Sequence, residues 1–211
     1  MNPDDDDPAG ARRAAGEGDR QLITTLLGVE SRAVRSLLDQ LGDGMAQIDP
    51  LLDAALSDPA RLEALRDTGL ADCRSHPALD RIAELTAEAL GTSQASINLI
   101  TPDAHLILGC SSAESGSPRS RPLSMSLSKF TVASREPLIV DDATQHPLLV
   151  THPAVEQGFA VAFAAIPLAD RRGNVVGTLS TWHTRGRKWT SGELQILENF
   201  AAITVAKIFS T

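Results

Sequence analysis

Two apolar runs separated by a tight turn constrain the fold of this chain more than any other feature. Residues 160–168 read AVAFAAIPL and residues 175–183 read VVGTLSTWH, and each has the length of one β-strand. The residues between them include DRRG at 170–173, which is typical of a turn because glycine tolerates a left-handed backbone. We therefore predict two strands joined by a turn.

Small side chains dominate the first of these strands. Ala160, Ala162, Ala164 and Ala165 all lie in it, so little side-chain volume projects from either face. Protein interiors contain few voids. Either a helix packs unusually close to this strand, or a cavity remains for a small molecule, since a cavity with a few polar groups is typical of a ligand site. Composition leaves both alternatives open.

The remaining patterns predict an α+β protein. Thr190 and Glu193 form the capping box that begins a helix, and apolar residues then recur at helical spacing. Other elements are expected from apolar periodicity and flanking Gly and Pro: helices over 59–69, 77–91 and 126–134, strands over 95–99, 105–110 and 138–141, and a surface loop over 111–121. The expected fold is a central antiparallel β-sheet flanked by helices and preceded by an N-terminal helical segment.

Two segments resemble a known family. Residues 126–143 read SLSKFTVASREPLIVDDA, a short helix running into a Pro-Leu strand that ends at Asp141. Residues 159–182 read FAVAFAAIPLADRRGNVVGTLSTW, in which a strand ending in Pro-Leu is followed by a glycine turn and by VGTL. In this order the chain resembles the core of a GAF domain, a small sensory module that bacterial signalling proteins use to hold a ligand or report a partner.

The resemblance implies where a ligand would bind. In GAF domains the pocket lies between the sheet and the layer of loops and helices from the middle of the chain. The lining residues implied here are Ser128, Phe130, Asp141, His146, Phe163 and Ser180. Each also has an ordinary structural interpretation, because buried phenylalanines usually belong to the core and Asp141 can cap the turn after its strand.

The chain divides into three parts. Residues 1–18 are acidic and lack apolar side chains in quantity, which predicts a disordered tail. Residues 19–57 carry apolar residues seven apart, which is typical of a helix that buries one stripe against another helix. Pro50 leaves open whether this segment is one helix or two, over 20–41 and 50–56. Residues 58–211 are expected to form the GAF domain.

A homodimer is expected from apolar stripes at both ends of the domain, although the N-terminal helix packing on its own domain is the alternative. The predicted interface comprises Leu27, Val34, Leu41, Ile48, Leu194, Leu197 and Ala201.

Charge and composition exclude several functions. The net charge of −8 and the absence of Tyr among seven aromatic residues argue against nucleic-acid binding. Neither a secretory signal nor an apolar run long enough for a membrane helix is visible, so we expect a cytoplasmic protein. The five histidines do not show the paired spacings of a metal site, and no metal is predicted.

Thiol chemistry is the alternative function. Cys73 and Cys110 would be reduced in the cytosol, but Cys110 ends a strand near Arg119 and Arg121, which would favour a thiolate. The free methionine sulfoxide reductases of this fold use three cysteines, whereas this chain has two. No nucleophile elbow or phosphate-binding loop is present, and we predict that the protein is not an enzyme.

Together these observations predict a cytoplasmic sensory or regulatory protein. It would bind a small ligand or a partner and signal through a helical dimer interface to a separate output protein. The alternatives are a redox sensor or redox enzyme that uses Cys110 and Cys73, and a ligand-free assembly scaffold.

Overall fold

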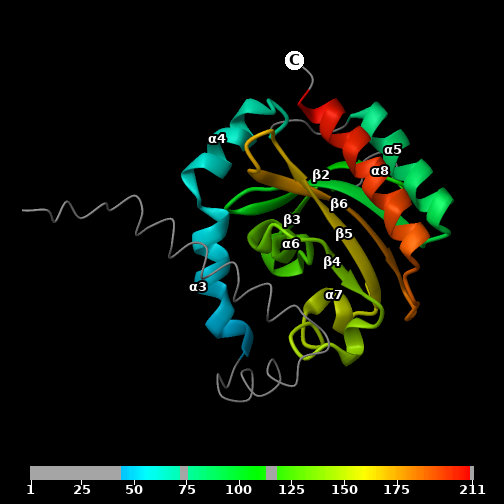
Figure 1. Cartoon of the computed structure of the whole chain (residues 1–211). Helices are drawn as coiled ribbons and strands as arrows, with labels where there is room; N and C mark the ends of the chain where they lie inside the picture. The colour runs from blue at the N-terminus through cyan, green and yellow to red at the C-terminus, as the bar shows by residue number, and fades with distance from the viewer. Residues whose placement is uncertain (1–43, 72–75, 113–117, 210–211) are drawn as a thin grey trace, which may run out of the picture.

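A six-stranded antiparallel sheet forms the centre of the molecule (Figure 1). The computed structural model describes residues 44–71, 76–112 and 118–209. The strand order is β3-β2-β1-β6-β5-β4. The strands are β1 (Gln94–Ile100), β2 (Ala104–Cys110), β3 (Ser120–Pro122), β4 (Leu138–Val140), β5 (Ala162–Ala169) and β6 (Val175–His183). The predicted α+β fold with a central antiparallel sheet is confirmed.

Two long helices cover one face of the sheet. Helices α5 (Pro77–Leu90) and α8 (Ser191–Ile208) lie side by side on the right of Figure 1. Helix α4 (Pro59–Asp67) contributes to the same apolar cluster. The cluster is closely packed, and its fully buried members include Leu79, Ile97, Ala164, Leu179 and Leu197.

Short elements cover the opposite face. They are the 3-10 turns η1 (Leu123–Met125) and η2 (Ala143–Gln145) and the helices α6 (Ser128–Ser134) and α7 (Pro153–Glu156). Helix α3 (Gly44–Leu56) lies outside α6, and its Ile48 and Leu52 share an apolar cluster with Phe130 of α6. Helix α6 is therefore enclosed between α3 and the sheet.

The VGTL segment contains a glycine that no other residue can replace without a backbone shift. A Cβ atom at Gly177 would lie 1.8 Å from the carbonyl oxygen of Asn98 on β1. This close approach allows β6 to pair with β1 along its length, with Ser96 opposite Ser180 and Asn98 opposite Thr178. The central pair of strands is therefore held in one register.

A buried arginine joins the helical segment to the sheet. The guanidinium of Arg61 donates to the carbonyl oxygen of Leu56 at 2.6 and 3.1 Å and to that of Ile100 at 2.7 Å. Burial lowers the pKa of Arg61 to about 10, so the side chain stays protonated at neutral pH. The end of α3 and the end of β1 are thereby tied to one charged group.

Helix α3 continues through the proline at which a break had been one alternative. Pro50 lies inside the helix, where proline costs about 3 kcal/mol. Ile48 and Leu52, one on each side of it, are each only 1% exposed, and their burial offsets this cost. The predicted helix over 20–41 lies outside the described residues.

The predicted dimer interface needs correction. Ile48, Leu197 and Ala201 are at most 3% exposed and pack inside their own domain, so a second chain cannot contact them appreciably. Leu194 is half-buried. The other predicted members, Leu27, Val34 and Leu41, lie outside the described residues. The seven-residue spacing had assigned to the dimer a stripe of α8 that is mostly buried.

Two smaller features also emerge. Residues 120 and 121, expected in a surface loop, belong to the edge strand β3, which pairs with β2. Within the described ranges, the helices are all too short or too polar to cross a membrane.

Replacing Arg61 by Ala should lower the free energy of unfolding by about 3 kcal/mol, because the carbonyl groups of Leu56 and Ile100 would be left buried without donors. Urea denaturation followed by circular dichroism measures this change. Arg66→Ala, at an exposed position of the same helix, is the control and should change stability by less than about 0.5 kcal/mol. Equal effects of the two substitutions would contradict the role of Arg61.

Candidate functional site

A cavity of about 430 Å³ lies between the sheet and the layer formed by η1, α6 and α7. Five strands and the covering layer contribute to its wall, so no single stretch of sequence defines it. The lining residues are Gln94, Ser96, His105, Ile107, Cys110, Arg121, Met125, Leu127, Ser128, Ala154, Phe159, Ala160, Phe163, Ser180 and Trp182. Its size and its mainly apolar wall with a few polar groups are typical of small-molecule sites.

Short polar side chains lie along β1 and β6, and two of them, Ser96 and Ser180, belong to the cavity wall. Ser96 and Ser180 face each other with their oxygens 3.2 Å apart, and the amide of Asn98 donates to Ser180 at 2.9 Å. Thr178 donates to the hydroxyl of Ser128, at the start of α6, at 2.9 Å. Strand alternation places these side chains on one face because their positions differ by two. They link the cavity to α6.

Both structural alternatives for the alanine-rich strand, close helix packing and a cavity, occur in the protein. Ala164 belongs to the cluster beneath α8, where a small side chain allows close helix packing. Ala165 and Phe163 belong to the cluster on the other face, and Ala160, just before β5, lines the cavity. Close packing and a cavity therefore occur on opposite faces of the sheet.

His105 is the least satisfied polar side chain on the wall. It is 8% exposed, and neither Nδ1 nor Nε2 has a hydrogen-bond partner. Burial, reinforced by the positive charge of Arg121, lowers the pKa of His105 to about 4. Buried polar atoms usually have partners, so a neutral imidazole with one free donor and one free acceptor marks a place where a bound molecule can supply them.

Three of the six predicted ligand residues meet at this cavity: Ser128, Phe163 and Ser180. That they contact a ligand stays a prediction. Phe130 is fully buried in the cluster shared with α3. His146 is 1% exposed, and its Nδ1 accepts the N–H of Leu148 at 3.2 Å. Both side chains stabilise the covering layer and are absent from the cavity wall.

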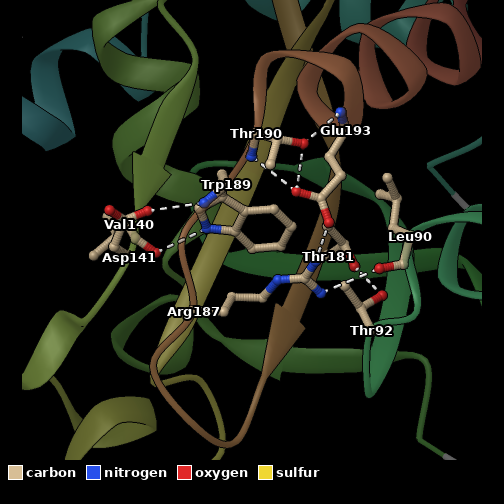
Figure 2. A network of polar contacts seen from close by, with 9 residues as sticks. All are labelled: Leu90, Thr92, Val140, Asp141, Thr181, Arg187, Trp189, Thr190 and Glu193. Atoms are coloured by element: carbon tan, nitrogen blue, oxygen red, sulfur yellow. Dashed lines mark hydrogen bonds and ion pairs between the residues drawn. The ribbon is translucent and has the colours of Figure 1, made fainter.

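Asp141 belongs to a different polar network, which positions the start of α8 (Figure 2). Its carboxylate accepts the backbone N–H of Trp189 at 3.2 Å and pairs with Lys188 at 2.9 Å. The indole N–H of Trp189 donates to the carbonyl of Val140 at 3.1 Å. These contacts fasten the loop before α8 to the end of β4.

Arg187 completes this network. Its guanidinium lies 4.6 Å from the ring centre of Trp189, donates to the carbonyl of Leu90 at 3.1 Å and pairs with Glu193. Glu193 also closes the predicted capping box with Thr190, and the N–H of Thr190 lowers the pKa of this carboxyl group. Helix α8 is thereby anchored to both β4 and α5.

The cysteines are only partly described. Cys110 is a half-buried free thiol on the cavity wall, 3.7 Å from the hydroxyl of Ser112. Arg119, expected beside this thiol, instead binds the carboxylate of Asp80 at 2.7 and 3.2 Å. Cys73 lies outside the described residues. In the described ranges, His, Cys, Asp and Glu side chains do not gather in threes as a metal site requires.

The wall residues that the sequence did not predict include His105, Arg121 and Trp182. His105 and Ile107 alternate with Leu106 and Leu108, so His105 was detectable as a polar residue on the inner side of a hairpin. Arg121 was not, because the strand that carries it has only three residues.

The model of the GAF domain family matches residues 75–207 of the 211-residue chain. The chain therefore belongs to the GAF domain family, as the two motif segments had indicated.

Solved structures give the same fold. The chain is similar to the GAF domain of an Acinetobacter phosphoenolpyruvate-protein phosphotransferase, with 19% identity and a TM-score of 0.52 over 72% of this chain and 94% of that one. It is also similar to a type II free methionine-R-sulfoxide reductase from Thermoplasma acidophilum, with 10% identity and a TM-score of 0.50 over 63% and 90%. No curated protein matches the chain.

Acid should destabilise the protein through its buried histidines. The unfolded chain takes up a proton on each histidine near pH 6.5, whereas folded His105 and His152 stay neutral down to about pH 4. The stability they contribute is therefore complete above pH 6.5 and is lost as the pH falls toward 4, with a slope of about 1.4 kcal/mol per pH unit for each histidine. His105→Gln should reduce the slope of the free energy of unfolding against pH by the contribution of one histidine. Urea denaturation at a series of pH values between 7.5 and 4.5 measures this slope. Parallel curves for the two proteins would contradict the assignment.

Proposed function

We propose that this GAF protein is a cytoplasmic sensory module that binds a small molecule in the cavity and passes its state to a separate output protein. The observation that carries the proposal is the cavity itself, with the unpartnered imidazole of His105 on its wall. Membership of a family of sensory modules supports it. The role is regulatory rather than catalytic.

The contacts of α6 provide a route from the cavity to the helical segment. Ser128 lines the cavity at one end of α6. Phe130, two residues later, packs against Ile48 and Leu52 of α3. A ligand that displaces Ser128 would therefore alter the packing of α3. Of two arrangements of α6 against α3, the ligand would favour the one to which it binds more tightly.

Charge reinforces the contact between these helices. The ammonium group of Lys129 lies 5.3 Å from the ring centre of Phe130. Burial lowers the pKa of Lys129, and the carboxylates of Asp49 and Asp53 on α3 oppose this shift. Movement of α6 would change both packing and charge at α3.

The thiol function has one supporting feature, which is the position of Cys110 on the cavity wall. A reagent or ligand in the cavity would reach its sulfur. Cys110 therefore belongs to the same site. Both the ligand-binding function and the thiol function require that a molecule enters the cavity.

Filling the cavity should abolish ligand binding. Ala160→Phe places a ring in the cavity wall, whereas Ala202→Phe adds the same ring at an exposed position of α8 and is the control. Native mass spectrometry of freshly purified protein and thermal-shift screening of a fragment library detect binding. A ligand at 100 times its Kd should stabilise the wild type and Ala202→Phe by about 2.7 kcal/mol, or roughly 5–10 °C, and leave Ala160→Phe unchanged.

The proposal fails if neither measurement finds a ligand for the wild type. It also fails if Ala160→Phe, correctly folded, binds the same fragments with the same shift.

Homodimerisation is part of the proposal, through the exposed apolar strip of α8. Ile196 and Ile203 are 36% and 54% exposed, with half-buried Phe200 between them. The double substitution Ile196→Glu with Ile203→Glu should give monomers in sedimentation velocity, because it places charges within the interface. Ala202→Glu, on another side of the same helix, should remain dimeric. A monomeric wild type or a dimeric double variant would contradict this interface.

A further inference from the structure

The charge on the described part of the cavity wall has one sign. Among the described residues on its wall, Arg121 is the one with a full charge at neutral pH, and no carboxylate is present. The closest other titratable base, His105, is neutral because its pKa lies at about 4. A ligand that enters therefore meets one positive charge and, among the described wall residues, no acidic group.

Arg121 and His105 occupy directly opposed positions. They are register partners in the β2–β3 pair, and both line the cavity. Side chains at opposed positions share one face of the sheet, with Cβ atoms about 5 Å apart. Both side chains therefore border the same part of the cavity.

Within the described ranges, neither side chain binds another group of the protein through its polar atoms. Both ring nitrogens of His105 lack a partner, and Arg121 forms no ion pair with any described residue. By contrast, nearby Arg119 is held by two hydrogen bonds to Asp80. Arginine donates two parallel hydrogen bonds to a carboxylate, and a neutral imidazole can donate a third.

The rest of the wall suits an apolar body. Ile107, Met125, Phe163 and Trp182 provide apolar and aromatic surface. The hydroxyls of Ser96 and Ser180 are already hydrogen-bonded to each other or to Asn98, so they need few hydrogen bonds from the ligand. A single cation is matched by a ligand with one negative charge, whereas nucleotides and other polyanions would need more.

We propose that the cavity binds a small organic monoanion, with its carboxylate held between Arg121 and His105 and a ring-sized apolar body against Phe163 and Trp182. This inference rests on the proposed ligand-binding function and names the chemical class of the ligand. Because Arg121 is exposed, the carboxylate lies at the mouth of the cavity and the apolar body lies inside.

Three probes with the same ring and different charge test the inference: 2-naphthoate, 2-naphthamide and 2-naphthylmethylammonium. Isothermal titration calorimetry should show that the wild type binds naphthoate at least tenfold more tightly than either of the others. Arg121→Gln should weaken naphthoate binding about tenfold, as expected for a partly exposed charged hydrogen bond, and leave naphthamide binding unchanged. Arg185→Gln, which removes an exposed arginine that does not line the cavity, is the control and should bind naphthoate like the wild type.

The outcomes separate this inference from the proposed function. If naphthamide or the ammonium probe binds as tightly as naphthoate, or if Arg121→Gln keeps full naphthoate affinity, the anion assignment is wrong and the cavity remains a ligand site. If all three probes fail while library fragments stabilise the wild type, the ligand class is again wrong. If no fragment binds either, the proposed function itself fails.

Discussion

The hydrogen bonds among short polar side chains on β1 and β6 are the constraint on which the site depends. Ser96, Asn98, Thr178 and Ser180 are buried, and buried polar atoms require partners. They satisfy most of this need with one another and with Ser128. Since these side chains are small and bonded together, little volume projects from the centre of this face. Helix α6 meets the sheet at Thr178, and a cavity remains beside this contact.

The two faces of the sheet consequently have different mechanical roles. Helices α5 and α8 pack closely on one face, where Ala164 and Leu197 are fully buried. The network around Arg187 and Trp189 in Figure 2 holds α8 to β4 and α5, so this side behaves as one body. On the other face, α6 lies between the sheet and α3. In the proposed sensory function, a change in the cavity would therefore reach α3 through α6.

Most of the fold was predictable from local patterns. Apolar runs and alternation with their flanking turns identified β1, β2, β5 and β6, and the capping box located the start of α8, because these signals depend on neighbouring residues only. The site was predicted in part. Ser128, Phe163 and Ser180 line the cavity, but Asp141 anchors the loop before α8 and Arg121 was not recognised as a wall residue. Both depend on contacts between segments far apart in the chain.

The amino-acid sequence by itself determined most of the secondary structure, the family and the small volume of the strand that borders the cavity. Periodicity, capping and turn chemistry act over a few residues, so they can be read without a fold. Only the tertiary structure decided which face of that strand borders the cavity and which stripe of α8 is exposed. It also decided that Arg121 lies opposite His105, because strand register is set by pairing across the sheet. Charge and burial at the site follow from that pairing.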